Sequence, residues 1–235
     1  MALRPSLLAR SARPLRWVHT MLAHFDPRTS RIVQSRPLAN DQAKWIGLRA
    51  IEWVDPSGKT RWWESADRTT RRGPVDAVAI IAIIQRPSKE PHILLVSQFR
   101  PPVGACVVEL PAGLIDAGES DQSGAQRAAL RELAEETGYG AQSGQVSVRQ
   151  TSAVMYNDPG MSGANMKLCT IDIALSDDAP EPLAHPDEGE YIEKHLVPLT
   201  SLAANLNDFA AQGYAIDARL MHLATGLALG LAKPW

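Results

Sequence analysis

An acidic segment framed by glycines, residues 113–139, constrains this chain more than any other feature. It reads GLIDAGESDQSGAQRAALRELAEETGY. Apolar residues recur at helical spacing in its second half, and Gly138 stands where a left-handed C-cap would end the helix. On such a helix Glu136 lies one turn after Glu132 and Glu135 lies three positions after it, so the three carboxylates converge. We therefore predict a helix with clustered negative charge that follows a glycine-containing loop.

These clustered carboxylates have two interpretations. Charges at such spacings are common on exposed helices, so the glutamates alone fit a solvated acidic face. Like charges this close are destabilising unless a cation lies between them, and Mg²⁺, with its preference for carboxylate and phosphate oxygens, meets that need. The glycine frame, with Gly113 and Gly118 before the helix and Gly138 after it, favours the cation site.

The segment resembles the signature of the Nudix hydrolases, G-x5-E-x7-R-E-U-x-E-E-x-G-U, in which U is apolar or aromatic. The matching positions are Gly113, Glu119, Arg131, Glu132, Leu133, Glu135, Glu136, Gly138 and Tyr139. The chain departs from the signature at one point, because the eleven residues 120–130, not seven, separate Glu119 from Arg131. The four extra residues equal about one helical turn, so either the helix starts one turn earlier with its acidic face in phase or the loop bulges. Ser123-x-x-Gln126 reads as a capping box, which favours the longer loop. The insertion bears on the role of Glu119 and not on the later carboxylates.

Composition fits an enzyme domain. With 235 residues, 45% of them hydrophobic, the chain can bury the core of one domain with a small attachment. Its formal charge of −2 argues against a general nucleic-acid binder. Cys106 and Cys169 are too few for a disulfide framework and lack metal-ligand spacing, so we expect both to be buried in a protein of a reducing compartment. No apolar run is long enough to span a bilayer.

The first 24 residues differ from the rest of the chain. They contain Arg4, Arg10, Arg13 and Arg16, and no acidic residue precedes Asp26. This composition is typical of a mitochondrial transit peptide, and it also fits a disordered basic tail without an address. Translation from Met21 would give a cytoplasmic form. Residues 25–41 are polar and aperiodic, and we interpret them as a linker.

Residues 42–74 read as an antiparallel hairpin with an unusual number of tryptophans. Strands at 45–54 and 59–65 flank the turn Asp55-Pro56-Ser57-Gly58. The four tryptophans are Trp45, Trp53, Trp62 and Trp63. Composition alone favours a small aromatic core or an oligomer interface over stacking faces for a flat ligand.

Residues 75–235 alternate strand and helix patterns. We expect strands at 75–84, 92–100, 106–110, 145–153, 166–174 and 191–197, and helices at 199–212 and 216–231 beside the acidic one. A run of strands with one helix inserted and two helices at the end predicts an α/β (α+β) fold in which a mixed β-sheet is sandwiched between helices.

Further segments extend the resemblance to the ADP-ribose pyrophosphatase (ADP-sugar diphosphatase) branch of the Nudix hydrolases, over about residues 42–235. They are 55–71, 98–102, 109–116, 158–160 and 217–219. The resemblance implies the Nudix fold for 75–235 and Mg²⁺-dependent hydrolysis of ADP-ribose to AMP and ribose 5-phosphate, with Mn²⁺ as an alternative ion. It also implies a homodimer in which the hairpin 42–74 is exchanged and the active site is shared.

The resemblance assigns the metal and catalytic roles as follows. Glu132, Glu136 and the backbone carbonyl of Ala112 would hold the metal ions. Glu190 would orient or deprotonate the attacking water, with Glu188 as the alternative. Glu135 and Arg131 would assist.

The resemblance also assigns the substrate contacts. Trp45 and Trp63, one from each subunit, would sandwich the adenine, which replaces the interpretation from composition alone, and Glu64 would accept from the adenine amino group. The remaining substrate-binding assignments are Arg68 and Arg100 to the diphosphate and Leu114 and Asp158 to the ribose pocket. Asn157 stands where relatives can carry an apolar residue, which bears on sugar preference.

Two other functions stay open. One is a Nudix diphosphatase for other nucleotide sugars, NADH or oxidised nucleoside diphosphates. The other is a non-catalytic adenine-nucleotide sensor, for which the insertion before Arg131 is the best support. The three helix glutamates argue against the sensor, because binding alone needs no cluster that activates water.

Overall fold

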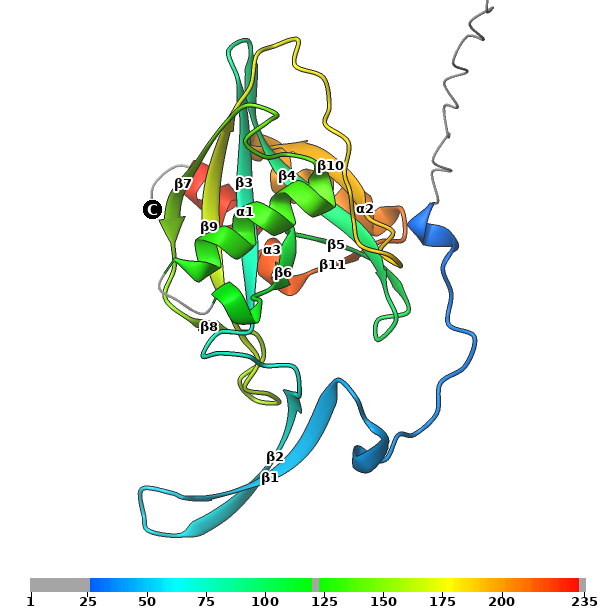
Figure 1. Cartoon of the computed structure of the whole chain (residues 1–235), viewed down its shortest axis with the longest axis vertical. Helices are drawn as coiled ribbons and strands as arrows, with labels where there is room; N and C mark the ends of the chain where they lie inside the picture. The colour runs from blue at the N-terminus through cyan, green and yellow to red at the C-terminus, as the bar shows by residue number, and fades with distance from the viewer. Residues whose placement is uncertain (1–25, 120–122, 233–235) are drawn as a thin grey trace, which may run out of the picture.

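A computed structural model describes residues 26–119 and 123–232 (Figure 1). The predicted transit segment, residues 1–24, lies outside the described residues. The strands are β1 (Ile46–Val54), β2 (Thr60–Arg68), β3 (Ala77–Arg86), β4 (Lys89–Arg100), β5 (Ala105–Glu109), β6 (Ala112–Leu114), β7 (Gln145–Thr151), β8 (Met155–Tyr156), β9 (Asn165–Ala174), β10 (Glu193–Pro198) and β11 (Ala215–Ile216). The α-helices are α1 (Gly124–Thr137), α2 (Leu202–Ala211) and α3 (Ala218–Leu231).

Nine strands form one mixed sheet, whose main path runs β11-β5-β4-β3-β9-β7. β10 pairs with β4, β6 with β3 and β8 with β9. The pairs β3–β9 and β11–β5 are parallel and the others are antiparallel. The near-continuous apolar run that predicted a buried strand is β3, which lies at the centre of this path.

Helices cover both faces of the sheet. Ile80, Ala82 and Ile84 of β3 belong to a core cluster that includes Leu133 of α1, whereas Ile83, one residue out of phase, packs in a second cluster with α2 and α3. Figure 1 shows α1 in front of the sheet and α3 behind it. The predicted mixed sheet between helices is confirmed, and so is the burial of Cys106 and Cys169.

Some predicted element bounds were wrong. The connection between the strands expected at 75–84 and 92–100 is shorter than those bounds imply, because β4 already begins at Lys89 and runs through Pro91. A register shift between Ile84 and Arg86 of β3 lies opposite this proline, which has no N–H to donate to a ladder. The expected loop at Gly113 is instead strand β6, which pairs with β3.

The hairpin β1–β2 is a separate two-stranded sheet that projects from the body of the molecule (Figure 1). Its turn forms as predicted, since the Gly58 N–H donates to the Asp55 carbonyl at 2.9 Å and Gly58 has φ +82°. The predicted linker contains two short 3-10 turns, Pro27–Thr29 and Asn40–Gln42. The first of them contacts β4 and β5. Among the described helices, none is long and apolar enough to cross a membrane.

Candidate active site

The acidic helix α1 is packed directly on β6. A Cβ on Gly113 would lie 1.8 Å from the Glu132 Cδ atom, so the glutamate side chain occupies the space that any larger residue would fill. A larger residue at the first glycine of the motif would therefore displace the Glu132 side chain from its place against the strand. Gly138 ends α1 as predicted, with φ +78° and its N–H donating to the Ala134 carbonyl.

Glu136 is the most deeply buried of the three helix carboxylates. It is 4% exposed, and its Oε2 accepts a hydrogen bond from the Ala112 N–H at 3.2 Å. Burial, followed by the charge of Glu132, raises the pKa of Glu136 to about 8, and Glu190 and Glu109 act in the same direction. Burial also raises the pKa of Glu132, with help from Glu135 and Glu190. Glu132 and Glu136 therefore repel each other in a partly dehydrated site, and the charge of the exposed Glu190 adds to this effect.

This donor set fits a divalent metal ion. Buried carboxylates that raise one another's pKa are stabilised by a cation, and their oxygens are the ligands that Mg²⁺ and Mn²⁺ prefer. Ala112, whose N–H contacts Glu136, carries the predicted backbone ligand. Within residues 26–119 and 123–232, no three Asp, Glu, His or Cys side chains already form a ligand cluster. Glu132 and Glu135 are instead held by Arg131.

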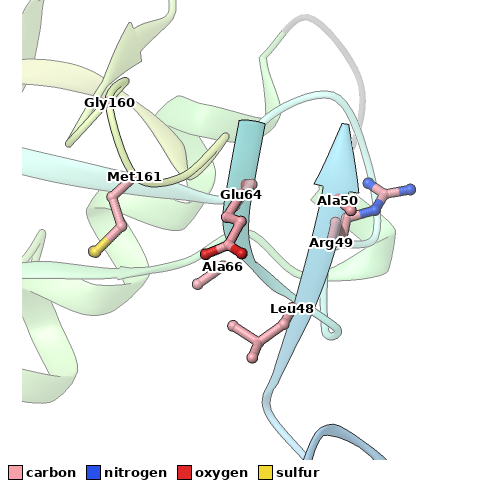
Figure 2. A pocket seen from close by; sticks show the side chains of 8 residues that line it. Leu48, Arg49, Ala50, Glu64, Ala66, Gly160 and Met161 are labelled. Atoms are coloured by element: carbon pink, nitrogen blue, oxygen red, sulfur yellow. The ribbon is translucent and has the colours of Figure 1, made fainter. Parts of the chain in front are cut away.

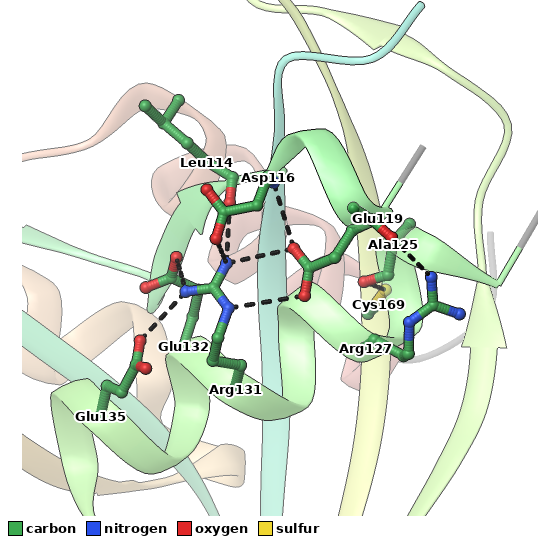
Figure 3. A network of polar contacts seen from close by, with 10 residues as sticks. Leu114, Asp116, Glu119, Ala125, Arg127, Arg131, Glu132, Glu135 and Cys169 are labelled. Carbon is green, nitrogen blue, oxygen red and sulfur yellow. Dashed lines mark hydrogen bonds and ion pairs between the residues drawn. The ribbon is translucent and has the colours of Figure 1, made fainter. Parts of the chain in front are cut away.

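Arg131 is the centre of a polar network (Figure 3). Its guanidinium donates to Glu132 at 2.8 Å, to Glu135 at 3.0 Å and to the Leu114 carbonyl at 3.0 Å. It also donates to Glu119 Oε2 at 3.2 Å. Burial raises the pKa of Glu119, but the hydrogen bonds from Arg131 and from the Asp116 N–H hold it below its ordinary value. Arg131 thus fixes the orientation of the carboxylates around it.

The insertion before Arg131 leaves Glu119 in contact with the helix. Glu119 ends a short 3-10 turn, Ala117–Glu119, and α1 begins at Gly124. The predicted capping box was wrong. Ser123 has αR backbone angles and makes no side-chain cap; its Oγ accepts from Arg127, and the Gln126 side chain donates to Thr151.

Glu190 lies in the loop before β10. The Asp187 N–H donates to its Oε2 at 3.3 Å, and Gly189 has φ +91°, which favours glycine. The negative charge of Glu190 raises the pKa of both Glu132 and Glu136, so the loop faces the acidic end of α1. Glu188, the predicted alternative, is exposed in the same turn.

Glu109, at the end of β5, is a site residue that sequence reasoning missed. It is 6% exposed and accepts from Arg100 Nε at 2.6 Å, and its charge contributes to the raised pKa of Glu136. The predicted diphosphate contact Arg100 is therefore held beside the carboxylates. A glutamate at the end of the otherwise apolar strand 106–110 was the signal that could have identified it.

A second group of predicted residues surrounds a hollow of about 170 Å³. Arg68 and Leu114 line it together with Arg71 and Asp116. Asp158, the other predicted ribose contact, does not line this hollow. It lies in the turn 158–162, where its carbonyl accepts from Met161 N and Ser162 N.

Comparison with known proteins decides the family. The model of the NUDIX domain matches residues 75–219. The chain belongs to the Nudix family. It is 45% identical to an uncharacterised Nudix hydrolase of Schizosaccharomyces pombe, over 86% of this chain and 94% of that one. It is 40% identical to the ADP-ribose pyrophosphatase of Saccharomyces cerevisiae (86% and 85% covered) and 38% identical to the ADP-sugar pyrophosphatase of Mus musculus (87% and 90%).

The sheet and helices described above are thus a Nudix fold, and the chain is a hydrolase of pyrophosphate bonds.

The hairpin β1–β2 precedes the matched Nudix domain. Its predicted adenine-binding residues do not converge within one chain. Trp63 donates from Nε1 to the Gly160 carbonyl at 3.0 Å, on one side of the hairpin. Glu64, the next residue, lines a different hollow of about 550 Å³ with Leu48, Ala66 and Met161 (Figure 2).

Trp45 and Trp63 are also separated along the ribbon. The Thr69 N–H donates to the Trp45 carbonyl, whereas Trp63 pairs with Ile51, six residues further along β1. Six residues of strand span about 20 Å. Both rings are exposed, at 69% and 52%.

Proposed function

We propose that this Nudix protein hydrolyses the diphosphate bond of ADP-ribose and related ADP-sugars, and that it releases AMP and ribose 5-phosphate from ADP-ribose. The observation that carries the proposal is the buried Glu136, which contacts Ala112 and lies within electrostatic reach of Glu132 and Glu190. The relatives named above as ADP-ribose and ADP-sugar pyrophosphatases, at 40% and 38% identity over most of the chain, support the choice of substrate.

Glu132, Glu136 and the Ala112 carbonyl would hold Mg²⁺. When bound, such ions neutralise the charge of a diphosphate and lower the pKa of a coordinated water. Glu190, across from these carboxylates, would accept the proton of the attacking water. Arg131 keeps Glu132 and Glu135 oriented through its bonds at 2.8 and 3.0 Å.

Two arginines would bind the diphosphate. Arg100 Nε donates to Glu109 at 2.6 Å, and the other guanidinium N–H groups would form charge-assisted bonds to phosphate oxygens. Arg68 lines the hollow that also includes Leu114, so it would contact the substrate on the side of that pocket. A planar, permanently charged fork suits both tasks.

The aromatic side of the site supports a homodimer. A base between two stacked rings leaves their centroids at most about 14 Å apart, because each stacked pair spans at most about 7 Å. Trp45 and Trp63 of one hairpin are attached about 20 Å apart along the ribbon. A sandwich formed by Trp45 of one subunit and Trp63 of the other would avoid this separation along the ribbon, and it would bury both exposed rings.

The insertion no longer supports a sensor that only binds adenine nucleotides. That function required a displaced Glu119, whereas Glu119 contacts Arg131 at 3.2 Å. A binding protein also has no need to bury a carboxylate at the cost that the raised pKa of Glu136 represents.

The test is AMP release from ADP-ribose with Mg²⁺ by wild type, by Glu136→Gln and by the matched control Asp178→Asn. Asp178 is exposed in a loop outside the site. We expect turnover by wild type and control, and a loss of at least about 1,000-fold in kcat for Glu136→Gln, because a catalytic metal contributes several kcal/mol. Tight binding of ADP-ribose without turnover would establish the sensor instead. Preferred turnover of NADH, other nucleotide sugars or oxidised nucleoside diphosphates would reassign the substrate.

A further inference from the structure

The C-terminal end of α1 is in close contact with a segment that precedes the Glu190 loop. A Cβ on Gly138 would lie 2.3 Å from the Leu183 carbonyl oxygen, so this segment packs against the helix terminus at backbone distance. Two residues further along, the His185 N–H donates to the Glu135 carbonyl at 2.8 Å. The loop is therefore attached to the acidic helix on the side before Glu190.

Lys194 attaches the same two elements on the side after Glu190. It is the second residue of β10, and its Nζ donates to the Thr137 carbonyl at 3.2 Å and to the Pro182 carbonyl. The ammonium also lies 5.4 Å from the centroid of the Tyr139 ring, which is fully buried. A cation at the last carbonyls of a helix is favoured by the helix dipole, and an ammonium can donate to two carbonyls at once.

Glu190 lies between these two attachments. His185 holds the chain five residues before it. Four residues after it, the backbone of β10 is paired with β4, and the Lys194 side chain ties this strand to the last turn of the helix that carries Glu132 and Glu136. The side chain of Glu190 bonds only weakly within its own turn, at 3.3 Å to Asp187 N. Its position relative to the helix carboxylates therefore depends on how the loop ends are held.

We propose that Lys194 is a positioning residue for the hydrolytic reaction: it ties the C-terminus of α1 to residues 182–192 and so sets the distance between Glu190 and the helix carboxylates. This inference rests on the proposed function, because it gives Glu190 a role at the reacting water. Lys194 itself touches carbonyl groups and an aromatic ring and has no contact with the carboxylates among its described bonds.

The experiment compares Lys194→Met, Lys194→Gln and Lys194→Arg with the control Lys89→Met, using the full chain with Mg²⁺ and ADP-ribose. Lys89 is exposed at the beginning of β4. We expect kcat of Lys194→Met to fall about 10–100-fold, because a displacement of about 1 Å at a reacting group has effects of this size. KM should stay within about twofold, since the substrate contacts are unchanged. Lys194→Arg, which keeps the charge and the donors, should recover most of kcat.

Hydrogen exchange gives a readout that does not require turnover. Backbone amides of residues 185–190 should exchange faster in Lys194→Met than in Lys89→Met, while amides in the middle of α1 stay protected. If Lys194→Met fails to fold, Lys194→Gln, which keeps an NH2 donor group but loses the charge and the full length of the side chain, is measured in its place.

Three results would overturn the proposal: unchanged kcat and exchange in Lys194→Met or Lys194→Gln; equal loss in the Arg and Met variants; or a fall in kcat only in proportion to the fraction unfolded. An inactive wild type would refute the proposed function instead. In that case the exchange of residues 185–190 alone decides whether Lys194 holds the loop.

Discussion

The acidic helix and the N-terminal hairpin contain the two halves of the predicted site, and these halves differ in burial and in their bonds to the rest of the chain. Around α1, Glu136 is 4% exposed, and Arg131 bonds to three carboxylates of its own chain. On the hairpin, Trp45 and Trp62 are 69% and 66% exposed, and Trp63 and Glu64 face different hollows. The carboxylate half is thus built by the fold of one chain, whereas the tryptophan rings of the aromatic half are exposed in that chain.

The largest effect that we expect in the carboxylate half is from Gly113→Ala. The added methyl group would lie 1.8 Å from Glu132 Cδ, and the neighbouring β6 is paired to the central strand β3, so the carboxylate must move. A shifted metal ligand should lower kcat at least about 100-fold at fixed Mg²⁺. Steady-state kinetics over a Mg²⁺ titration measures this loss. Gly118→Ala, where nothing lies within 4 Å of the added Cβ, is the matched control. Wild-type kcat in Gly113→Ala would show that β6 does not hold Glu132 in place.

The hairpin half can be tested by mixing two variants that each bind the substrate weakly. Trp45→Ala and Trp63→Ala should each raise KM more than they lower kcat, with losses in kcat/KM of about 10–100-fold, because stacking on a base contributes about 1–3 kcal/mol. If each site takes Trp45 from one subunit and Trp63 from the other, mixed dimers contain one intact site. Refolding the two variants together should then restore about a quarter of the wild-type sites.

No recovery on mixing would mean that both tryptophans act within one chain, or that only one of them contacts the substrate. The single variants distinguish these outcomes, since a tryptophan that does not touch the base leaves KM unchanged. Size measurements of the same samples show whether dimers have formed.

The two halves also differ in how far the sequence predicts them. Helix periodicity located α1 and its capping glycine, because both depend on local chain geometry. The apolar run at β3 was readable as a buried strand because both of its faces are covered by helices. The capping box at Ser123 failed since Arg127 and Thr151, which lie outside the local pattern, compete for the two side chains.

Other site features depend on contacts between segments far apart in the chain, and local sequence patterns do not predict such contacts. The approach of Gly113 to Glu132 joins β6 to α1, and Lys194 bonds to a carbonyl 57 residues away. In the sequence, Glu109 is only the end of an apolar strand; its bond to Arg100 and its effect on the pKa of Glu136 depend on the fold. For the hairpin, the tryptophans were identifiable, but their partner surface is not part of the chain's own core.

The smallest expected effect concerns stability in the absence of metal, and it should appear only in the acidic half. Glu136 has a pKa of about 8 in the folded protein and an ordinary value of 4.5, so the folded state holds this proton more tightly than the unfolded state. The contribution of this proton to the free energy of unfolding is fully present below pH 4.5, decreases as the pH rises from 4.5 to 8 and is lost above pH 8. In EDTA, we expect the free energy of unfolding to fall by about 1–3 kcal/mol between pH 5 and pH 8.5.

Urea unfolding at both pH values measures this change, and Glu136→Gln should remove most of it because an amide has no proton to lose. Asp76 and Asp217 titrate outside the window, since Arg71 and Arg219 hold their pKa values below the ordinary range against the effect of burial. Addition of Mg²⁺ at pH 8.5 should restore the lost stability in the wild type but less so in Glu136→Gln. A pH dependence that is equal in both proteins would assign the change to groups other than Glu136.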